Sequence, residues 1–295
     1  MSLFILFGYE SMQLLIVGAM GMAVVIAGST SVQTSSTPLP PKARYVAMGS
    51  SYAAGPGIPD PVDANTRCAR STNNYAHQFA RKRGLTLIDV SCSGATTNDI
   101  LTASSDTPAQ IDAITPETSL VTVTIGGNDV GFVTLLGSAS CRQLGIGKQL
   151  LGGKCPKPPK LTEHTWRNLA VSMERIAAEV RVRAPRARLV FIDYPIVLPS
   201  SGRCAATPMS TGKADAARNI ANRLAVATAA AARSSGATLV RASSLSSGHD
   251  ACSATPWING FPLPGQPRFV PYHPNLDGMA AVARALDATI TQIRS

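Results

Sequence analysis

Four polar or glycine-rich segments of the chain hold the residue types that acyl transfer requires. They are Gly49-Ser-Ser-Tyr-Ala-Ala-Gly55, Ser91-Cys-Ser-Gly-Ala-Thr-Thr97, Gly126-Gly-Asn-Asp129 and Tyr272-His-Pro-Asn275. A serine hydroxyl is a nucleophile, and an imidazole activates it as a base and then protonates the leaving alcohol. Glycine N–H groups and an asparagine amide donate hydrogen bonds to the oxyanion of the intermediate. Together the four segments predict nucleophilic catalysis by serine.

Taken singly, each of these residues has a more ordinary interpretation. A serine after a strand is usually a turn residue, and Gly94 alone indicates a tight turn. Asn128 and Asp129 are typical helix caps, and a lone His273 is more often structural. The order of the residues along the chain and their place at strand ends favour the catalytic interpretation.

The segments that must position these residues alternate between strand and helix patterns. Apolar runs predict strands at residues 45–48, 85–90, 120–125, 189–192 and 238–240, and periodic stripes predict helices over 74–83, 166–180, 214–233 and 276–293. This alternation indicates an α/β fold, with a parallel sheet covered by helices on both faces. Ligands of such sheets bind outside the carboxyl ends of the strands, where three of the four segments begin.

The four segments resemble the motif blocks of the SGNH (GDSL-like) hydrolases. That family has Gly-Asp-Ser-x-x-x-Gly near the N-terminus, then a glycine turn, Gly-x-Asn-Asp, and a C-terminal histidine before a helix. The resemblance spans residues 43–295 and is greatest to secreted actinobacterial-type lipases and esterases. Those enzymes share a Trp-x-Asn-Gly segment, which here is Trp257-Ile-Asn-Gly260.

The resemblance assigns a role to each block. Ser51 is implied as the nucleophile and His273 as the general base. The N–H groups of Ser51 and Gly94 and the side chain of Asn128 are implied as the oxyanion hole. The implied fold is a flavodoxin-like three-layer α/β/α sandwich of about five strands in the order 2-1-3-4-5.

Two departures from the family pattern bear on the chemistry. Ser50 stands where the first block normally has Asp, so the charge at that position is missing. Val270 stands where many members have the triad acid, three residues before the histidine. In the actinobacterial-type enzymes a backbone carbonyl orients the imidazole, and Val270 O is the candidate. We therefore expect a Ser–His dyad, with Asp250 and Asp277 as less favoured triad acids.

Other histidines and other mechanisms are weaker candidates. His249 follows the fifth predicted strand and is the main competitor of His273 as the base, although a role in a substrate loop or a surface loop is the favoured interpretation. The chain has no G-x-S-x-G, P-loop, G-x-G-x-x-G or H-E-x-x-H motif. With only four histidines and no helical pair, no metal and no cofactor are expected.

The six cysteines indicate an exported protein. They include no C-x-x-C pair, so a disulfide framework is favoured over a zinc site or free buried thiols. Six cysteines allow 15 connectivities. Sequential pairing gives the shortest loops and is preferred, and the related lipases also have three sequential disulfides. The cysteines are Cys68, Cys92, Cys141, Cys155, Cys204 and Cys252.

The N-terminal region has the character of an export signal. Residues 14–28 are uncharged and mostly apolar, which suits the core of a signal peptide, although no Lys or Arg precedes Lys42. We expect a signal peptide or an N-terminal membrane anchor over residues 1–29. A disordered linker over 30–42 and the hydrolase domain over 43–295 follow. The expected location is secreted, periplasmic or extracellular, in a bacterium.

Composition narrows the range of partners. The chain has 295 residues, 45% hydrophobic and 15% charged, which excludes a disordered protein. Its net charge is +10, but the basic residues are scattered and only 5% of the chain is aromatic. Nucleic-acid binding is therefore not expected. Weak contact with anionic membrane surfaces is the most that the charge suggests, and the chain is expected to be a monomer.

Two long segments are candidates for substrate binding. Residues 137–161 form a Gly/Pro/Lys-rich insertion around Cys141 and Cys155, and residues 253–272 form a loop rich in aromatic residues. Aromatic side chains beside His273 predict an apolar slot for a fatty-acyl chain, unless they only cover the end of the sheet. The aromatic residues in question are Trp257, Phe261, Phe269 and Tyr272.

The favoured function is an exported serine esterase or lipase that hydrolyses small-molecule or lipid esters through an acyl-enzyme. A polysaccharide O-acetyl esterase is the related alternative. A non-catalytic, disulfide-stapled binding module is the alternative from another class. The absence of the aspartate at Ser50 supports it, but the presence of all four other motif residues argues against it: Ser51, Gly94, Asn128 and His273.

Overall fold

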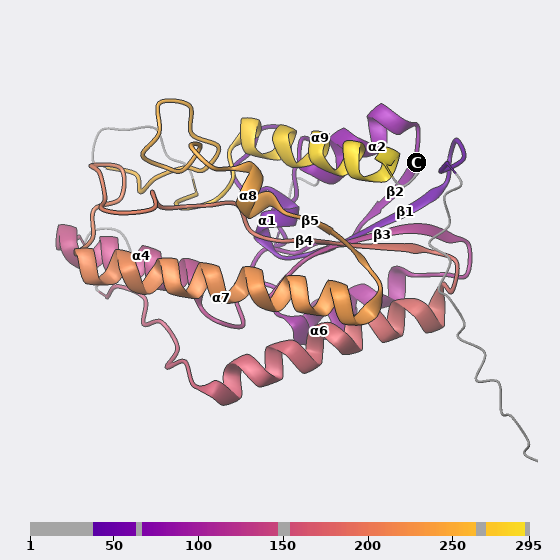
Figure 1. Cartoon of the computed structure of the whole chain (residues 1–295), viewed down its shortest axis with the longest axis horizontal. Coiled ribbons are helices and arrows are strands. Elements are labelled where there is room, and N and C mark those ends of the chain that lie inside the picture. Colours follow the sequence, from indigo (N-terminus) through magenta and orange to yellow (C-terminus); the bar gives the residue numbers. More distant parts are fainter. Residues whose placement is uncertain (1–37, 63–66, 147–153, 264–269, 293–295) are drawn as a thin grey trace, which may run out of the picture. The chain divides into compact units, whose positions relative to one another are not determined.

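The computed structural model describes residues 38–62, 67–146, 154–263 and 270–292. Its centre is a parallel five-stranded sheet in the order β2-β1-β3-β4-β5 (Figure 1). The strands are β1 (Arg44–Gly49), β2 (Thr86–Asp89), β3 (Thr118–Thr124), β4 (Arg188–Ile192) and β5 (Thr238–Val240). The predicted fold class and strand order are confirmed. The order reverses between β1 and β3, and a parallel sheet binds its ligands at such a switch point.

Helices cover both faces of the sheet (Figure 1). One face packs against α2 (Tyr75–Arg83) and α9 (Leu276–Gln292). The other face packs against α3 (Thr97–Leu101), α4 (Phe132–Leu144), α6 (Glu163–Arg183) and α7 (Thr211–Ser235). Two short helices, α1 (Ser51–Ala54) and α8 (Ala242–Leu245), follow strand ends, and a 3₁₀ turn spans Gln110–Ala113.

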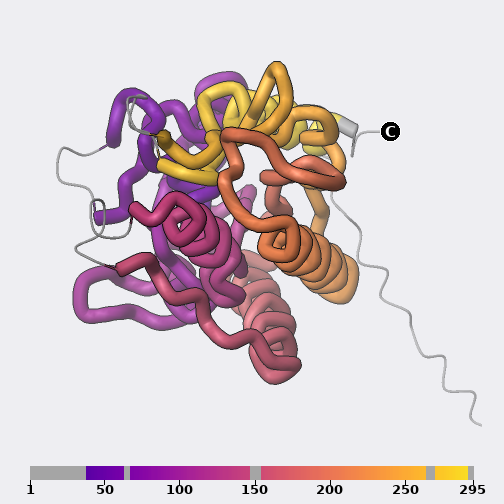
Figure 2. Tube along the Cα trace, turned by 90° about the vertical axis from the view of Figure 1, so that its left-hand side faces the viewer, coloured from indigo at the N-terminus to yellow at the C-terminus, as the bar shows by residue number. Residues whose placement is uncertain are grey.

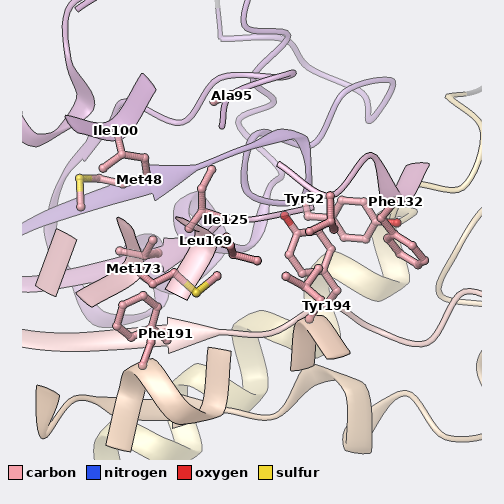
Figure 3. Packing of buried hydrophobic residues seen from close by; sticks show 14 of the residues in the cluster. Met48, Tyr52, Ala95, Ile100, Ile125, Phe132, Leu169, Met173, Phe191 and Tyr194 are labelled. Atoms are coloured by element: carbon pink, nitrogen blue, oxygen red, sulfur yellow. The ribbon is translucent and has the colours of Figure 1, made fainter. Parts of the chain in front are cut away.

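Side-chain alternation along the strands builds a separate core on each face. Tyr45 and Ala47 of β1 point into the core with α2 and α9, whereas Val46 and Met48 point into the opposite core. In that second core the thioether of Met173 lies among aliphatic and aromatic side chains of the sheet and of α6 (Figure 3). Strands that are buried on both faces read as continuous apolar runs, which is why they could be located in the sequence.

Capping residues set the ends of the helices that carry chemistry. Asn275 caps α9, because its Oδ1 accepts the N–H of Gly278 at 2.9 Å. Asn74 caps α2 in the same way through the N–H of His77, and Gly84 ends α2 with φ +62°. The four predicted helices are all present, and α6 and α7 extend beyond their predicted bounds.

Helix α4 departs from the sequence-based expectation. Residues 137–161 were expected to form one long loop, but α4 continues to Leu144 and carries Cys141. Residues 147–153 of this segment lie outside the described residues. The helix forms because it buries Phe132, Leu135, Leu136 and Ala139 on one side, and this burial outweighs the weak helix preference of its glycine and serines.

Three disulfides connect the loops. The pairs are Cys68–Cys92, Cys141–Cys155 and Cys204–Cys252, which is the preferred sequential pairing.

The N-terminal expectations fall mostly outside the described residues, namely the signal peptide or anchor over 1–29 and most of the linker over 30–42. Residues 38–42 are ordered against the domain, because the Lys42 N–H donates to Gly84 O at 2.7 Å and Leu39 packs on the core. Among the helices of the described residues, none combines the length and apolar character that a membrane span requires.

Candidate active site

Ser51 lies at the carboxyl end of β1, in the first turn of α1, and is 6% exposed. The bend before it requires Gly49, which has φ +145° and whose added Cβ would lie 2.5 Å from Thr124 O. Gln110 holds this bend by accepting the Gly49 N–H at 2.7 Å and donating to Gly49 O at 3.0 Å. No motif indicates Gln110, because its amide comes from a 3₁₀ turn far along the chain.

His273 forms a hydrogen-bonded pair with Ser51. Its Nε2 lies 2.7 Å from Ser51 Oγ, and its Nδ1 lies 2.8 Å from Pro271 O. A carbonyl oxygen can only accept, so Nδ1 carries the proton and Nε2 presents its lone pair to the Ser51 hydroxyl. This is the tautomer in which an imidazole removes a proton from serine.

The carbonyl that orients His273 belongs to Pro271, so the expectation of Val270 O is wrong. Val270 O instead faces the side chain of Asn259 at 3.5 Å. The difference arises at Tyr272, whose φ of +60° turns the chain back so that the carbonyl two residues before His273 meets its ring. Tyr272 is held in this conformation by the Tyr52 hydroxyl, which donates to Tyr272 O at 2.5 Å.

Burial lowers the pKa of His273 from 6.5 to about 4, and the hydrogen bond to Pro271 O offsets part of this shift. Removing the ring from water disfavours its charged form. The histidine is 7% exposed and is therefore neutral at physiological pH, ready to act as a base.

Three hydrogen-bond donors border the same cavity as the Ser–His pair. The backbone N–H groups of Ser51 and Gly94 have no acceptor among the described residues. The Asn128 side chain donates to Ala95 O at 2.9 Å, which leaves its second amide hydrogen free to bind an oxyanion. Gly94 has φ +85°, a conformation that favours glycine.

The carboxylate of Asp129 ties the Asn128 turn to α3. It accepts the N–H of Thr97 at 3.1 Å and the hydroxyl of Thr97 at 2.5 Å. Burial raises the pKa of Asp129, and these hydrogen bonds counteract the shift. The turns after β2 and β3 are thereby fixed to each other.

The cavity at Ser51 has a volume of about 340 Å³. Its lining combines the Ser–His pair and the oxyanion donors with small apolar side chains: Ser51, Pro56, Ser93, Gly94, Asn128, Val133, Thr134, Gly137, Pro156, Val270 and His273. It lies at the carboxyl ends of the strands, among the loops that face the viewer in Figure 2. A larger cavity of about 890 Å³ between α7 and the loop after β4 contains neither Ser51 nor His273.

The expected aromatic wall is absent from the lining that the described residues form. Tyr272 and Phe261 are buried, and the centroids of their rings lie 6.0 Å apart. Trp257 stacks on His249, with 4.0 Å between the ring centroids. Phe269 lies outside the described residues. The aromatic residues therefore support the loop that carries His273.

Similarity to known proteins identifies the family of this chain. Residues 47–281 match the model of the GDSL-like Lipase/Acylhydrolase family. The chain belongs to this family. It is 36% identical, over 90% of its length and 91% of the relative's, to the Streptomyces coelicolor protein named Lipase 2. This membership makes the chain a carboxylic ester hydrolase.

Solved structures of the family share the fold. The extracellular lipase of Streptomyces rimosus is 26% identical, with a TM-score of 0.65 over 83% of this chain and 99% of that one. Phospholipase A1 from Streptomyces albidoflavus NA297 gives a TM-score of 0.67 over 84% and 99%, at 24% identity.

This GDSL-like chain has an uncharged residue, Ser50, where the first family block normally has an aspartate. Ser50 is 1% exposed, and its Oγ lies 3.2 Å from the hydroxyl of Tyr194. The same hydroxyl accepts the N–H of Gly127 at 2.9 Å. Tyr194 thus joins the residue before the nucleophile to the residue before Asn128. The sequence did not indicate Tyr194, since it follows β4 in a loop without a motif.

The segment Trp257-Ile-Asn-Gly260 positions His273 through its backbone. Ile258 forms an antiparallel bridge with Pro274, and the N–H of Asn259 donates to His273 O at 2.9 Å. Trp257 O accepts the N–H of Asn275 at 2.9 Å. The segment therefore holds both sides of the histidine.

The competing residues are occupied elsewhere. His249 Nδ1 lies 2.7 Å from Thr255 O, so this histidine is part of a loop that does not line the cavity. Asp250 accepts the N–H of Cys252, and Asp277 is exposed in the first turn of α9. Within the described ranges, no three His, Cys, Asp or Glu side chains lie close enough together to hold a metal ion.

Proposed function

We propose that this chain hydrolyses carboxylic esters through a Ser51–His273 dyad and an acyl-enzyme intermediate. The observation that carries the proposal is the hydrogen bond of 2.7 Å between Ser51 Oγ and the unprotonated Nε2 of His273. The non-catalytic alternative gives no reason for this tautomer beside two backbone N–H groups without an acceptor among the described residues and an amide with a free hydrogen. The uncharged Ser50 does not favour that alternative either, because Tyr194 makes a connection at that position.

The proposed reaction has two balanced halves. Ser51 Oγ attacks the ester carbonyl carbon while His273 Nε2 takes its proton, and the oxyanion forms against Ser51, Gly94 and Asn128. The intermediate collapses, the C–O bond to the alcohol breaks, and His273 returns the proton to the leaving oxygen. A water molecule then attacks the carbonyl carbon of the acyl-enzyme and loses a proton to Nε2. The bond between Ser51 Oγ and the acyl carbon breaks, His273 returns the proton to Ser51 Oγ, and the carboxylic acid is released.

No carboxylate side chain contacts His273 among the described residues, so its imidazolium is stabilised by Pro271 O alone. A carbonyl dipole stabilises the cation less than a full negative charge does. We infer that the missing stabilisation limits the rate of the dyad rather than its specificity.

The proposed substrates are esters with an apolar acyl chain. Pro56, Val133, Pro156 and Val270 contribute apolar surface to the cavity. A lipid ester satisfies such a lining better than a polysaccharide acetate, which needs hydrogen-bond partners for its sugar hydroxyls. Acetylated glycans therefore serve as a comparison substrate.

The proposed enzyme is exported and acts as a monomer. All six cysteines form disulfides, which persist in oxidising compartments. The apolar run at residues 14–28 supports export through a signal peptide or retention by an anchor. The net charge of +10 supports weak contact with anionic membrane surfaces.

The test is hydrolysis of p-nitrophenyl acetate, butyrate and palmitate and of acetylated xylan by the full chain. Ser51→Ala and His273→Ala are measured beside it, with Ser243→Ala as a matched control in α8, whose hydroxyl binds Asp193. We expect turnover of the p-nitrophenyl esters that Ser51→Ala and His273→Ala abolish and Ser243→Ala preserves. Equal activity in wild type and Ser51→Ala would contradict the proposed nucleophile, and activity on acetylated xylan alone would contradict the substrate.

A further inference from the structure

Gly137 lies in the middle of α4 and lines the cavity at Ser51. A Cβ built on it would meet no neighbouring atom within 4 Å. Its backbone is ordinary right-handed helix without positive φ, so neither conformation nor packing requires a glycine here.

The glycines around Gly137 are glycines for structural reasons. An added Cβ at Gly127 would lie 2.8 Å from the ring of Tyr194, and one at Gly126 would lie 2.8 Å from Met173. A Cβ at Gly131 would overlap Pro159, and Gly278 of α9 approaches Trp257 in the same way. In contrast, any small side chain fits at Gly137.

A glycine that the structure does not require destabilises a helix relative to alanine. The side chain that is missing at Gly137 would project into the catalytic cavity, since this is the face of α4 that lines it. The absence of that side chain therefore leaves volume for a bound substrate.

The neighbours of Gly137 make its face of α4 a wall of the cavity. Val133 and Thr134 precede Gly137 by four and three residues, so the three share one side of the helix. Pro156 continues this wall, and the disulfide Cys141–Cys155 attaches it to α4. The helix itself is fixed to the oxyanion turn, because the N–H of Phe132 donates to Gly127 O at 2.9 Å.

We propose that Gly137 sets the length of acyl chain that the cavity accepts. The inference rests on the proposed esterase function and names the specificity-determining position of that same site. The leaving oxygen must face Nε2 of His273 to receive its proton, which assigns the alcohol to the histidine side. The wall formed by Val133, Thr134, Gly137 and Pro156 carries no titratable group and suits the acyl chain.

The size of the cavity makes a single side chain decisive. Its volume of about 340 Å³ lies at the low end for small-molecule sites. One methylene in an apolar pocket changes discrimination by roughly 10–200-fold. A leucine at position 137 fills space that the chain of a longer ester would otherwise occupy.

The experiment measures kcat/KM of the full chain for p-nitrophenyl acetate, butyrate, octanoate and palmitate. Gly137→Ala and Gly137→Leu are compared with wild type. Gln143→Leu is the matched control, because it adds the same side chain to an exposed position of α4 that does not line the cavity. Thermal unfolding of each variant is recorded in parallel.

We expect Gly137→Leu to lower the octanoate-to-acetate ratio of kcat/KM by about tenfold or more. Gly137→Ala lowers the ratio less and raises the melting temperature, because alanine is the better helix former. Gln143→Leu leaves the ratio unchanged. Gly137→Ala keeps the test decisive even where the leucine variant does not fold.

Three results would overturn the inference. If wild type is active and its octanoate-to-acetate ratio is the same as that of Gly137→Ala and Gly137→Leu, Gly137 is not a determinant while the esterase function stands. Octyl acetate is measured beside the p-nitrophenyl esters, and a loss of kcat/KM in Gly137→Leu for octyl acetate but not for the octanoate ester assigns the wall to the alcohol instead. A wild type inactive on every ester overturns this inference and the proposed function together, so the two failures are distinguishable.

Discussion

The hydroxyl of Tyr194 accepts the backbone N–H of Gly127 at 2.9 Å, one residue before Asn128, the proposed oxyanion donor. The tyrosine is buried, and burial raises the pKa of its hydroxyl, so this group is neutral at any working pH. Its ring packs against Tyr52 at 4.6 Å, beside the nucleophile. Figure 3 shows the two rings together with Phe132 at one end of the apolar cluster. A neutral side chain thus links the nucleophile turn to the oxyanion turn.

Tyr194→Phe is expected to lower kcat while KM changes little. The substitution keeps the ring but leaves the buried N–H of Gly127 without an acceptor, which costs roughly 1–3 kcal/mol. If Asn128 is displaced with its turn, kcat falls about tenfold, the equivalent of ~1.4 kcal/mol. Tyr45→Phe is the control, because it removes a buried hydroxyl bonded to Thr122 in the opposite core. Equal losses of kcat in both variants would show that Tyr194 acts only through stability.

The pH profile of kcat/KM is expected to be flat from neutrality down to about pH 5. The reacting form of His273 is the neutral ring, and burial lowers its pKa to about 4, so protonation removes activity only near that value. A midpoint near 6.5 contradicts the buried geometry. Circular dichroism at each pH separates loss of the base from loss of the fold.

The free energy of unfolding is expected to decrease as the pH falls, because the pKa of His273 is lower in the folded chain than in the unfolded chain. His273 has a pKa of 6.5 in water and about 4 when folded, so the unfolded chain binds the proton first. The contribution of His273 to stability is complete above about pH 6.5 and is lost as the pH falls towards 4. Urea unfolding at pH 7 and pH 5 measures this change, and His273→Gln should reduce the difference between the two midpoints.

Asn128→Ala is expected to lower kcat by about 10²–10³ with little change in KM, as for other oxyanion donors. The amide contacts the substrate oxygen mainly when it becomes charged, so the loss concentrates in the transition state. Asn168→Ala, which removes an exposed amide beside His164 on α6, is the control. A rise in KM at constant kcat instead assigns Asn128 to substrate binding.

Removal of the disulfide Cys141–Cys155 is expected to raise KM for longer acyl esters and to lower stability. Pro156 follows this bridge and lines the cavity. The chain-entropy estimate for a loop of this length is about 3 kcal/mol. Kinetics of the Cys141→Ala/Cys155→Ala variant test this. Cys204→Ala/Cys252→Ala serves as a comparison, because it opens a bridge away from the cavity and should lower stability without changing KM.

Much of the fold was predictable because its strands are buried on both faces. Leu120, Val121 and Val123 are fully buried in β3, and such apolar runs can be recognised in the sequence. Helix α4 was not predictable, because it contains Gly137 and three serines or threonines and its stability comes from tertiary burial. The same glycine that concealed the helix is the one that opens the cavity.

Some residues of the site were predictable from the sequence, and others were not. Motif blocks indicated Ser51, Gly94, Asn128 and His273, and the structure brings these four to one cavity. The supports of the site were not predictable, because Gln110 and Tyr194 bind backbone groups with side chains that belong to no motif, and Pro271 contributes only its carbonyl. The choice between the carbonyls of Val270 and Pro271 depends on the positive φ of Tyr272, which a sequence pattern does not reveal.

Ser51 and His273 are separated by 222 positions, and the histidine enters the cavity only where α9 begins. During synthesis from the N-terminus, the proposed nucleophile therefore emerges long before the proposed base. A growing chain holds Ser51 without its histidine partner until residue 273 has left the ribosome. A chain that is interrupted before this residue therefore lacks the proposed dyad.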